Sequence, residues 1–124
     1  MARYVDGFLL VVPKKKLALY RRLATLAGKV WRAHGALEYR ECVADDLSMT
    51  GPASFASRTR AKKGETIVFS WIVYRSRAQR DKVNAKVMKD PRMVAMMTAM
   101  KDPKTWPFDM QRMSYAGFRV LVEA

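Results

Sequence analysis

The sequence predicts an α+β fold with the element order βαββαβ. Four segments rich in β-branched and aromatic residues end at prolines or turn residues, which is typical of strands. Between the first and second of them, and between the third and fourth, apolar residues recur at the three- and four-residue steps of amphipathic helices. The right-handed crossover rule folds this order into a four-stranded antiparallel sheet with both helices on one face, a ferredoxin-like sandwich.

The first strand and the first helix cover residues 4–34. Residues 4–12 form the predicted strand, which Pro13 ends because proline lacks the N–H that a sheet needs. Residues 14–34 form the predicted helix, and Gly35 follows where a left-handed C-cap residue belongs. The apolar side of this helix consists of Leu17, Tyr20, Ala24, Ala27 and Trp31.

Two further strands are expected before the second helix. Residues 36–44 alternate polar and apolar positions, which predicts a half-exposed or edge strand. Residues 45–64 contain Pro52 and a basic cluster, and we expect a long connection with a short helical turn near residues 53–58. Residues 66–74 are apolar at both parities, which predicts a central strand covered on both faces.

The remaining elements follow from capping signals. Ser76 is the expected N-cap of a second helix that ends at Lys89. Asp90 and Pro91 then start a short helix over residues 93–100. Residues 101–109 are expected to be irregular, and residues 113–122 form the fourth strand. The apolar side of the second helix is predicted to be Ala78, Val83, Val87 and Met88.

Composition narrows the class of protein. The 124 residues suit one domain, residues 1–124, and the formal net charge is +13. A single cysteine and a single histidine exclude an internal disulfide and the usual metal sites, so we expect no metal and no cofactor. The longest early apolar run, residues 7–13, is too short to cross a bilayer and has no cleavage site after it. We therefore expect a cytoplasmic protein without a membrane partner.

The first and third strands predict an assembly. Both are apolar at both parities, yet two helices on one side of the sheet cover only one face. A bare apolar sheet face is not tolerated on a monomer. We therefore expect a homodimer in which the uncovered faces of two sheets meet.

Specific motifs are spread over nearly the whole chain. They are Tyr4-Val-Asp-Gly-Phe8, Gly35-Ala-Leu37, Glu41-Cys42, Ala44-Asp-Asp46, Val68-Phe-Ser-Trp-Ile72, Arg80-Asp81, Asn84, Lys86-Val-Met88, Asp90-Pro-Arg-Met93, Pro107-Phe-Asp109 and Arg112-Met113. In combination they resemble the small uncharacterised bacterial YbaA-like proteins. The resemblance implies a dimeric α/β-barrel fold and implies no particular reaction.

Three polar residues within strands are candidate catalytic residues: Asp6, Glu41 and Ser70. A carboxylate inside an apolar strand is costly unless it is paired, and desolvation raises its pKa into the range of a general base. The alternative for Asp6 is an ion pair with an arginine such as Arg112, or a place at the exposed start of the strand.

Three other residues are candidate ligand-binding residues: Arg80, Asn84 and Arg112. Arg80 and Asn84 share one helix face by their four-residue spacing, and the alternative is that this face is solvated. Together with Asp6, Glu41 and Ser70 they predict a site between the sheet and the second helix.

His34 is expected to interact with the C-terminal dipole of its helix. The methionines between residues 88 and 100 line an adaptable ligand pocket or simply fill the core.

Three functions fit these observations, and the sequence does not decide whether the protein is an enzyme. The leading hypothesis is a homodimer that binds a small molecule in a pocket between the sheet and the helices. Cofactor-independent oxygenase or isomerase chemistry follows only by analogy with other dimeric α/β barrels. The alternative is a basic protein that binds nucleic acid or another polyanion without sequence specificity. A structural or regulatory dimer without a ligand is the third hypothesis.

Overall fold

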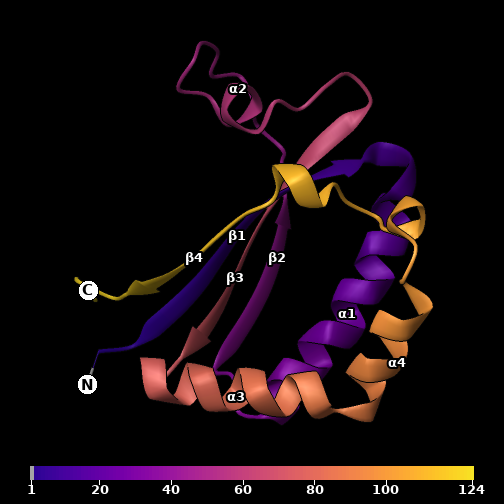
Figure 1. Ribbon diagram of the computed structural model, residues 1–124. Helices are drawn as coiled ribbons and strands as arrows, with labels where there is room; N and C mark the ends of the chain where they lie inside the picture. Colours follow the sequence, from indigo (N-terminus) through magenta and orange to yellow (C-terminus); the bar gives the residue numbers. More distant parts are fainter. Residues whose placement is uncertain (1) are drawn as a thin grey trace.

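The computed structural model describes residues 2–124 and has the predicted element order (Figure 1). Its four strands form one antiparallel sheet in the order β2-β3-β1-β4. Their bounds are Tyr4–Pro13 for β1, Glu38–Val43 for β2, Glu65–Tyr74 for β3 and Ser114–Arg119 for β4. The prediction of a central third strand and of an edge position for the second is therefore confirmed.

The long helices lie together on one side of this sheet (Figure 1). They are α1 (Leu17–Ala33), α3 (Arg77–Lys89) and α4 (Pro91–Ala99). As predicted, α3 begins after Ser76, whose side chain accepts a hydrogen bond from the Gln79 amide. Asp90 caps α4 by accepting from the Arg92 amide, and proline occupies the first turn. The ferredoxin-like α+β arrangement follows from these elements.

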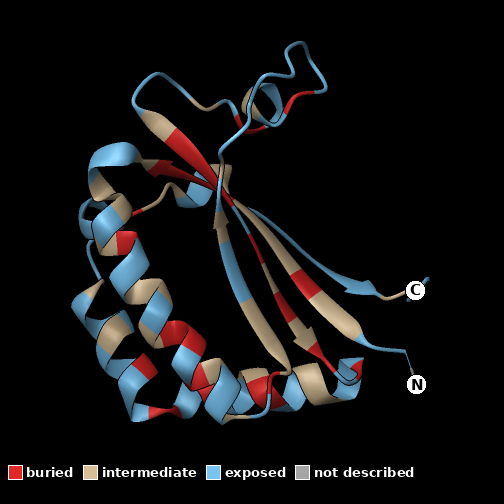
Figure 2. Ribbon diagram, turned by 180° about the vertical axis from the view of Figure 1, so that it is seen from behind, coloured by how far each residue is buried: buried red, intermediate tan, exposed pale blue. Residues whose placement is uncertain are grey.

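The core lies between the helices and the side chains that point toward them from the two central strands. Leu10 and Val12 of β1 and Val68 of β3 pack beneath Tyr20 of α1. Near the other end of the sheet, a second cluster joins the central strand β3 to α1, α3 and α4. Its buried members are Ala27, Val30, Ala36, Ile72, Tyr74, Val83, Val87 and Met93. Figure 2 shows these buried stripes on the central strands and on the helices.

The opposite face of the sheet is not entirely bare, which differs from the prediction. The helix α2 (Phe55–Thr59) contacts β1 and β3 on that side. The ring centre of Phe55 in α2 lies 6.4 Å from the ring centre of Phe69 on that face, where Val11 and Ile67 are fully or almost fully buried. The short helical turn expected near residues 53–58 is therefore present, and Ser54 caps it by accepting a hydrogen bond from the Ser57 amide. The remainder of that face stays apolar and partly exposed.

Several boundaries differ from the prediction for physical reasons. Residues 14–16 form a 3₁₀ turn before α1, directly after the strand that ends at Pro13. The last strand stops at Arg119, because after the bond from the Val120 amide to the Arg3 carbonyl no neighbouring strand continues the ladder.

In α3 only Val83 and Val87 are buried, and the expected apolar residues Ala78 and Met88 are exposed.

Two short 3₁₀ helices lie in and directly after the segment expected to be irregular. One of them, Pro103–Thr105, lies within residues 101–109, and the other, Met110–Arg112, follows directly after that segment; each comes after an aspartate that caps it. Among residues 2–124, no helix is both long and apolar enough to cross a membrane.

Candidate functional site

A cavity of about 220 Å³ lies between the sheet and the helices. Its walls are mostly apolar and come from β1, β3, α1, α4 and the segment before β4. Met93 and Met96 line it, whereas Met88 and Met97 are exposed. The methionine-rich segment therefore divides between a cavity wall and the surface.

A carboxylate with two tyrosine partners forms the polar part of this cavity. The Tyr20 hydroxyl donates to Glu41 Oε1 at 2.6 Å, and the Tyr39 hydroxyl donates to Glu41 Oε2 at 2.7 Å. Burial, followed by the charge of Glu41, raises the pKa of both phenols well above the ordinary value. Both tyrosines therefore stay protonated at neutral pH and fix the orientation of the carboxylate.

Ser70 lies directly opposite Glu41 on the neighbouring strand and lines the same cavity. The two residues share the helix-facing side of the sheet because their positions are paired across β2 and β3. The structure therefore brings together two of the three candidate catalytic residues.

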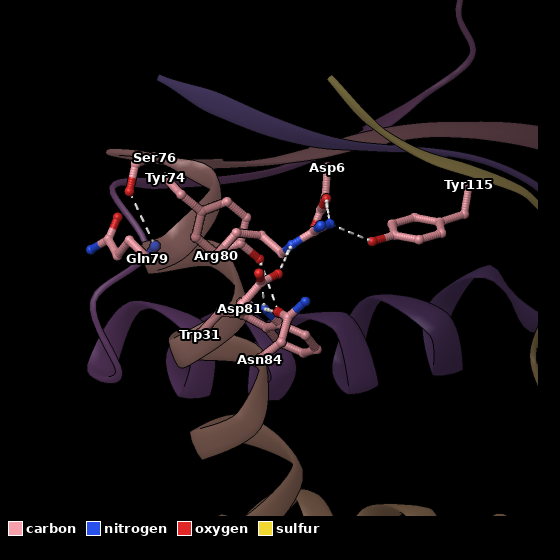
Figure 3. Close-up of polar contacts among 9 residues, drawn as sticks. All are labelled: Asp6, Trp31, Tyr74, Ser76, Gln79, Arg80, Asp81, Asn84 and Tyr115. Carbon is pink, nitrogen blue, oxygen red and sulfur yellow. Dashed lines mark hydrogen bonds and ion pairs between the residues drawn. The ribbon is translucent and has the colours of Figure 1, made fainter. Parts of the chain in front are cut away.

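Asp6 belongs to a different cluster, nearer to the start of α3 (Figure 3). It is 1% exposed, and its Oδ1 accepts a hydrogen bond from Arg80 Nη1 at 2.7 Å. The same Arg80 nitrogen donates to the Tyr115 hydroxyl, and the guanidinium lies 4.8 Å from the centre of the Tyr4 ring. Asp6 is thus held as the buried partner of an arginine, and that arginine is Arg80 rather than Arg112.

Asn84 joins a neutral network beside this pair. Trp31 Nε1 donates to the Tyr74 hydroxyl and to Asn84 Oδ1, and the Tyr74 hydroxyl also donates to Asn84 Oδ1, each at 3.1 Å. Burial and the nearby charge of Asp6 raise the pKa of Tyr74. The interpretation of a solvated helix face is wrong for Arg80 and Asn84, because both side chains point into the protein and are hydrogen-bonded there.

Arg112 lies apart from the other candidates. Its guanidinium binds both oxygens of Glu65, at 2.8 and 2.6 Å, and also donates to Asp109. These bonds lower the pKa of Glu65 from 4.5 to about 2. Arg112 therefore ties the segment before β4 to the start of β3 and makes no contact with Asp6.

His34 has a partner in addition to the helix dipole. It is the C-cap residue of α1, and its Nε2 lies 2.8 Å from Asp90 Oδ2. Arg92 binds the same carboxylate, and together the two partners hold the pKa of Asp90 below its ordinary value. This cluster joins the end of α1 to the junction of α3 and α4.

The tyrosines around Glu41 are members of the candidate site that sequence reasoning missed. The sequence predicts Tyr20 on the apolar side of its helix, and the structure buries it there, but helical spacing alone identifies no partner for its hydroxyl. A buried tyrosine usually finds a hydrogen-bond partner for its hydroxyl. Glu41, the strand carboxylate that faces the helix layer, supplies that partner.

The strand order, with the long helices on one face, defines the class as ferredoxin-like α+β proteins. A crystal structure of a dimeric ferredoxin-like protein from an uncultured marine organism matches with a TM-score of 0.61 and 11% identity, over 100% of both chains. A nipsnap family protein with unknown function from Agrobacterium tumefaciens matches with a TM-score of 0.56 and 12% identity, over 96% of this chain and 88% of the other. These likenesses show the fold alone.

The family follows from sequence comparisons. Residues 3–110 match the family described as Protein of unknown function (DUF1428). The chain is also 39% identical to the Uncharacterized protein YbaA of Escherichia coli K12 and to that of Shigella flexneri, over 98% of each chain. The chain therefore belongs to the DUF1428 family, and the resemblance to YbaA-like proteins is confirmed.

Proposed function

We propose that this protein binds a small molecule in the cavity between the sheet and α1. The observation that carries the proposal is the combination of mostly apolar walls with a few polar residues, among them Tyr20, Tyr39, Arg40, Glu41 and Ser70. Ligand sites in proteins commonly have this composition, because apolar walls supply affinity and a few polar groups orient the ligand.

The chemistry that suits these groups is proton transfer of the isomerase or cofactor-independent oxygenase type. Glu41 is the base in this proposal, because its carboxylate is oriented by two phenols at the cavity wall. Ser70, on the opposite strand, donates a hydrogen bond to an oxygen of the substrate. Asp6, Arg80 and Asn84 stabilise the far end of the sheet, and Arg112 anchors the segment that closes one side of the cavity.

The proposal includes a homodimer formed through the sheet face that α2 leaves uncovered. Phe69 is 47% exposed and Phe118 is 57% exposed on that face, beside the partly buried Leu9 and Trp71. The same face of a second copy is a suitable cover, because it is apolar in the same places. Two solved neighbours in fold are described as dimeric ferredoxin-like proteins, which supports this assembly.

Native mass spectrometry of the purified protein tests the cavity. We expect a small molecule that stays bound under native conditions and leaves on denaturation. The variant Ala24→Phe, which places a ring in the cavity wall, should lose it, whereas Ala18→Phe on the exposed side of α1 should keep it. A wild-type protein that retains no molecule, and that no compound of a metabolite library stabilises in thermal unfolding, would contradict the proposal.

Sedimentation velocity tests the assembly separately. We expect a dimer at micromolar concentration that Phe118→Glu converts to a monomer. Val94→Glu is the matched control, because Val94 is also exposed but lies on α4, away from that sheet face. A wild-type protein that sediments as a monomer would overturn the dimer without affecting the cavity.

A further inference from the structure

We infer that the ligand of the cavity is an amphipathic anion. Its acidic group lies outside the cavity, on a basic stripe of α1 formed by Arg21, Lys29 and Arg32. The inference rests on the proposed function and adds the chemical class of the ligand. It comes from a second, larger space that adjoins the cavity.

This second space is a groove of about 630 Å³ between α1 and the edge strand β2. Tyr20, Ala24, Tyr39 and Glu41 line both the groove and the cavity. These four residues therefore form a wall that is common to the two spaces. A molecule that extends beyond the cavity on this side enters the groove.

The helix side of the groove is basic. Arg21, Lys29 and Arg32 line it at intervals that place them along one side of α1. Arg32 is fixed by its hydrogen bonds to the carbonyls of Ala36 and Leu37. No ion pair within residues 2–124 engages Arg21 or Lys29.

The one acidic residue of the groove does not neutralise this stripe. Glu41 is a single carboxylate against three cations, and each of its oxygens already accepts a bond from a tyrosine. An incoming acid therefore meets a net positive surface. An ionised acid buried in the apolar cavity would lose its hydration, so the favourable arrangement leaves the acid in the groove and the apolar body inside.

The wall between the two spaces contains two hydrogen bonds to Glu41 that differ in exposure. The bond between Tyr39 and Glu41 lies on the exposed side, whereas the bond between Tyr20 and Glu41 is partly buried. In our inference the ligand passes where the exposed Tyr39–Glu41 bond is released, while the Tyr20–Glu41 bond keeps the carboxylate at the cavity wall. The ligand body then lies against Ala24, with its acid within reach of Arg21 and Lys29.

Isothermal titration calorimetry with two probes of matched shape tests the inference. Sodium 2-naphthoate carries an acid on a two-ring apolar body, and 2-naphthalenemethanol carries a neutral hydroxyl on the same body. We expect the acid to bind about tenfold more tightly than the alcohol at low salt, and this ratio to shrink as salt screens the stripe. Ala24→Phe should weaken both probes.

Charge-reversal variants locate the effect. Arg21→Glu with Lys29→Glu should abolish the preference for the acid and leave the affinity of the alcohol unchanged. Arg22→Glu with Lys86→Glu is the matched control, because it changes the net charge equally at exposed positions that do not line the groove. Thermal unfolding of each variant verifies that it is folded.

Several outcomes would overturn the inference. Equal affinity for the acid and the alcohol would show that the site does not prefer anions, although the cavity would still be a binding site. Equal loss of preference in both charge-reversal variants would assign the effect to net charge rather than to the stripe. Binding of neither probe, or binding of the acid that Ala24→Phe leaves intact, would also exclude this ligand class. Native mass spectrometry decides the proposed function independently of these results.

Discussion

The Asp6–Arg80 pair makes a sharp prediction at the scale of single residues. Asp6→Asn leaves the guanidinium of Arg80 without its buried partner, and we expect a loss of about 3 kcal/mol in the free energy of unfolding. Asp81→Asn is the matched control, since Asp81 binds the same arginine but its side chain is 63% exposed. That control should cost less than about 1 kcal/mol in urea unfolding. Equal losses would show that Asp6 contributes no more than a surface partner.

The ion pair between Glu65 and Arg112 predicts how the free energy of unfolding depends on pH. The pKa of Glu65 falls from 4.5 to about 2 in the folded protein because Arg112 binds both carboxylate oxygens. A lowered folded-state pKa stabilises the protein above the unfolded value, and this contribution is lost as pH falls from about 4.5 toward 2. Thermal unfolding should therefore show a decline in Tm over that window. Glu65→Gln should make the decline shallower, and an unchanged slope would contradict the assignment.

Sequence reasoning identified which residues are unusual but not which residues they contact. Asp6 stands out because it is a carboxylate in an apolar strand, and the structure buries it. Its partner Arg80 is distant in sequence, and its four-residue spacing from Asn84 fits a solvated helix face as well as a ligand site. Pairing between distant residues depends on strand register and on the docking of α3, and neither is encoded in local spacing.

The packing of α1 on β2 makes a prediction at the scale of elements. Gly28 lies under the ring of Tyr39, and a Cβ at that position would stand 2.8 Å from Tyr39 Cδ1. Gly28→Ala should therefore destabilise the protein, although alanine favours a helix by about 1 kcal/mol over glycine. In a Tyr39→Ala background the ring is absent, and the same change should become stabilising. Urea unfolding of the four proteins measures this reversal of sign, and a destabilising effect in both backgrounds would exclude the Tyr39 ring as its cause.

Elements with strong periodicity were predictable, and their ends and the long connection were less so. The four strands and the main helices follow from apolar spacing and from the caps at Ser76 and Asp90. The covering role of α2 was not predictable, because five residues carry too little periodicity to show which face of a sheet they contact. The residue at which β4 ends was also not predictable. It depends on where the neighbouring strand β1 stops supplying hydrogen-bond partners.

The net charge of +13 belongs to the scale of the whole molecule. We expect any binding to nucleic acid to be weak and without sequence preference, because phosphate contacts release counterions and carry no sequence information. Titration of duplex and single-stranded oligonucleotides at two salt concentrations measures this. Affinity should fall steeply with salt and be equal for unrelated sequences. Tight binding that persists at physiological salt would favour the polyanion-binding alternative, and sequence-selective binding would contradict the expected lack of sequence preference.

The central position of β1 sets the order in which the sheet is built during synthesis. β1 pairs on one edge with β3 and on the other with β4, so both of its neighbours are made later than β1 itself. The apolar residues of β1 have no strand to pair with until β3, which ends at Tyr74, has left the ribosome. The two central strands of the sheet cannot pair before that point. Such distant pairings slow folding and prolong the exposure of aggregation-prone segments. The nascent chain should therefore depend on chaperones more than its short length suggests.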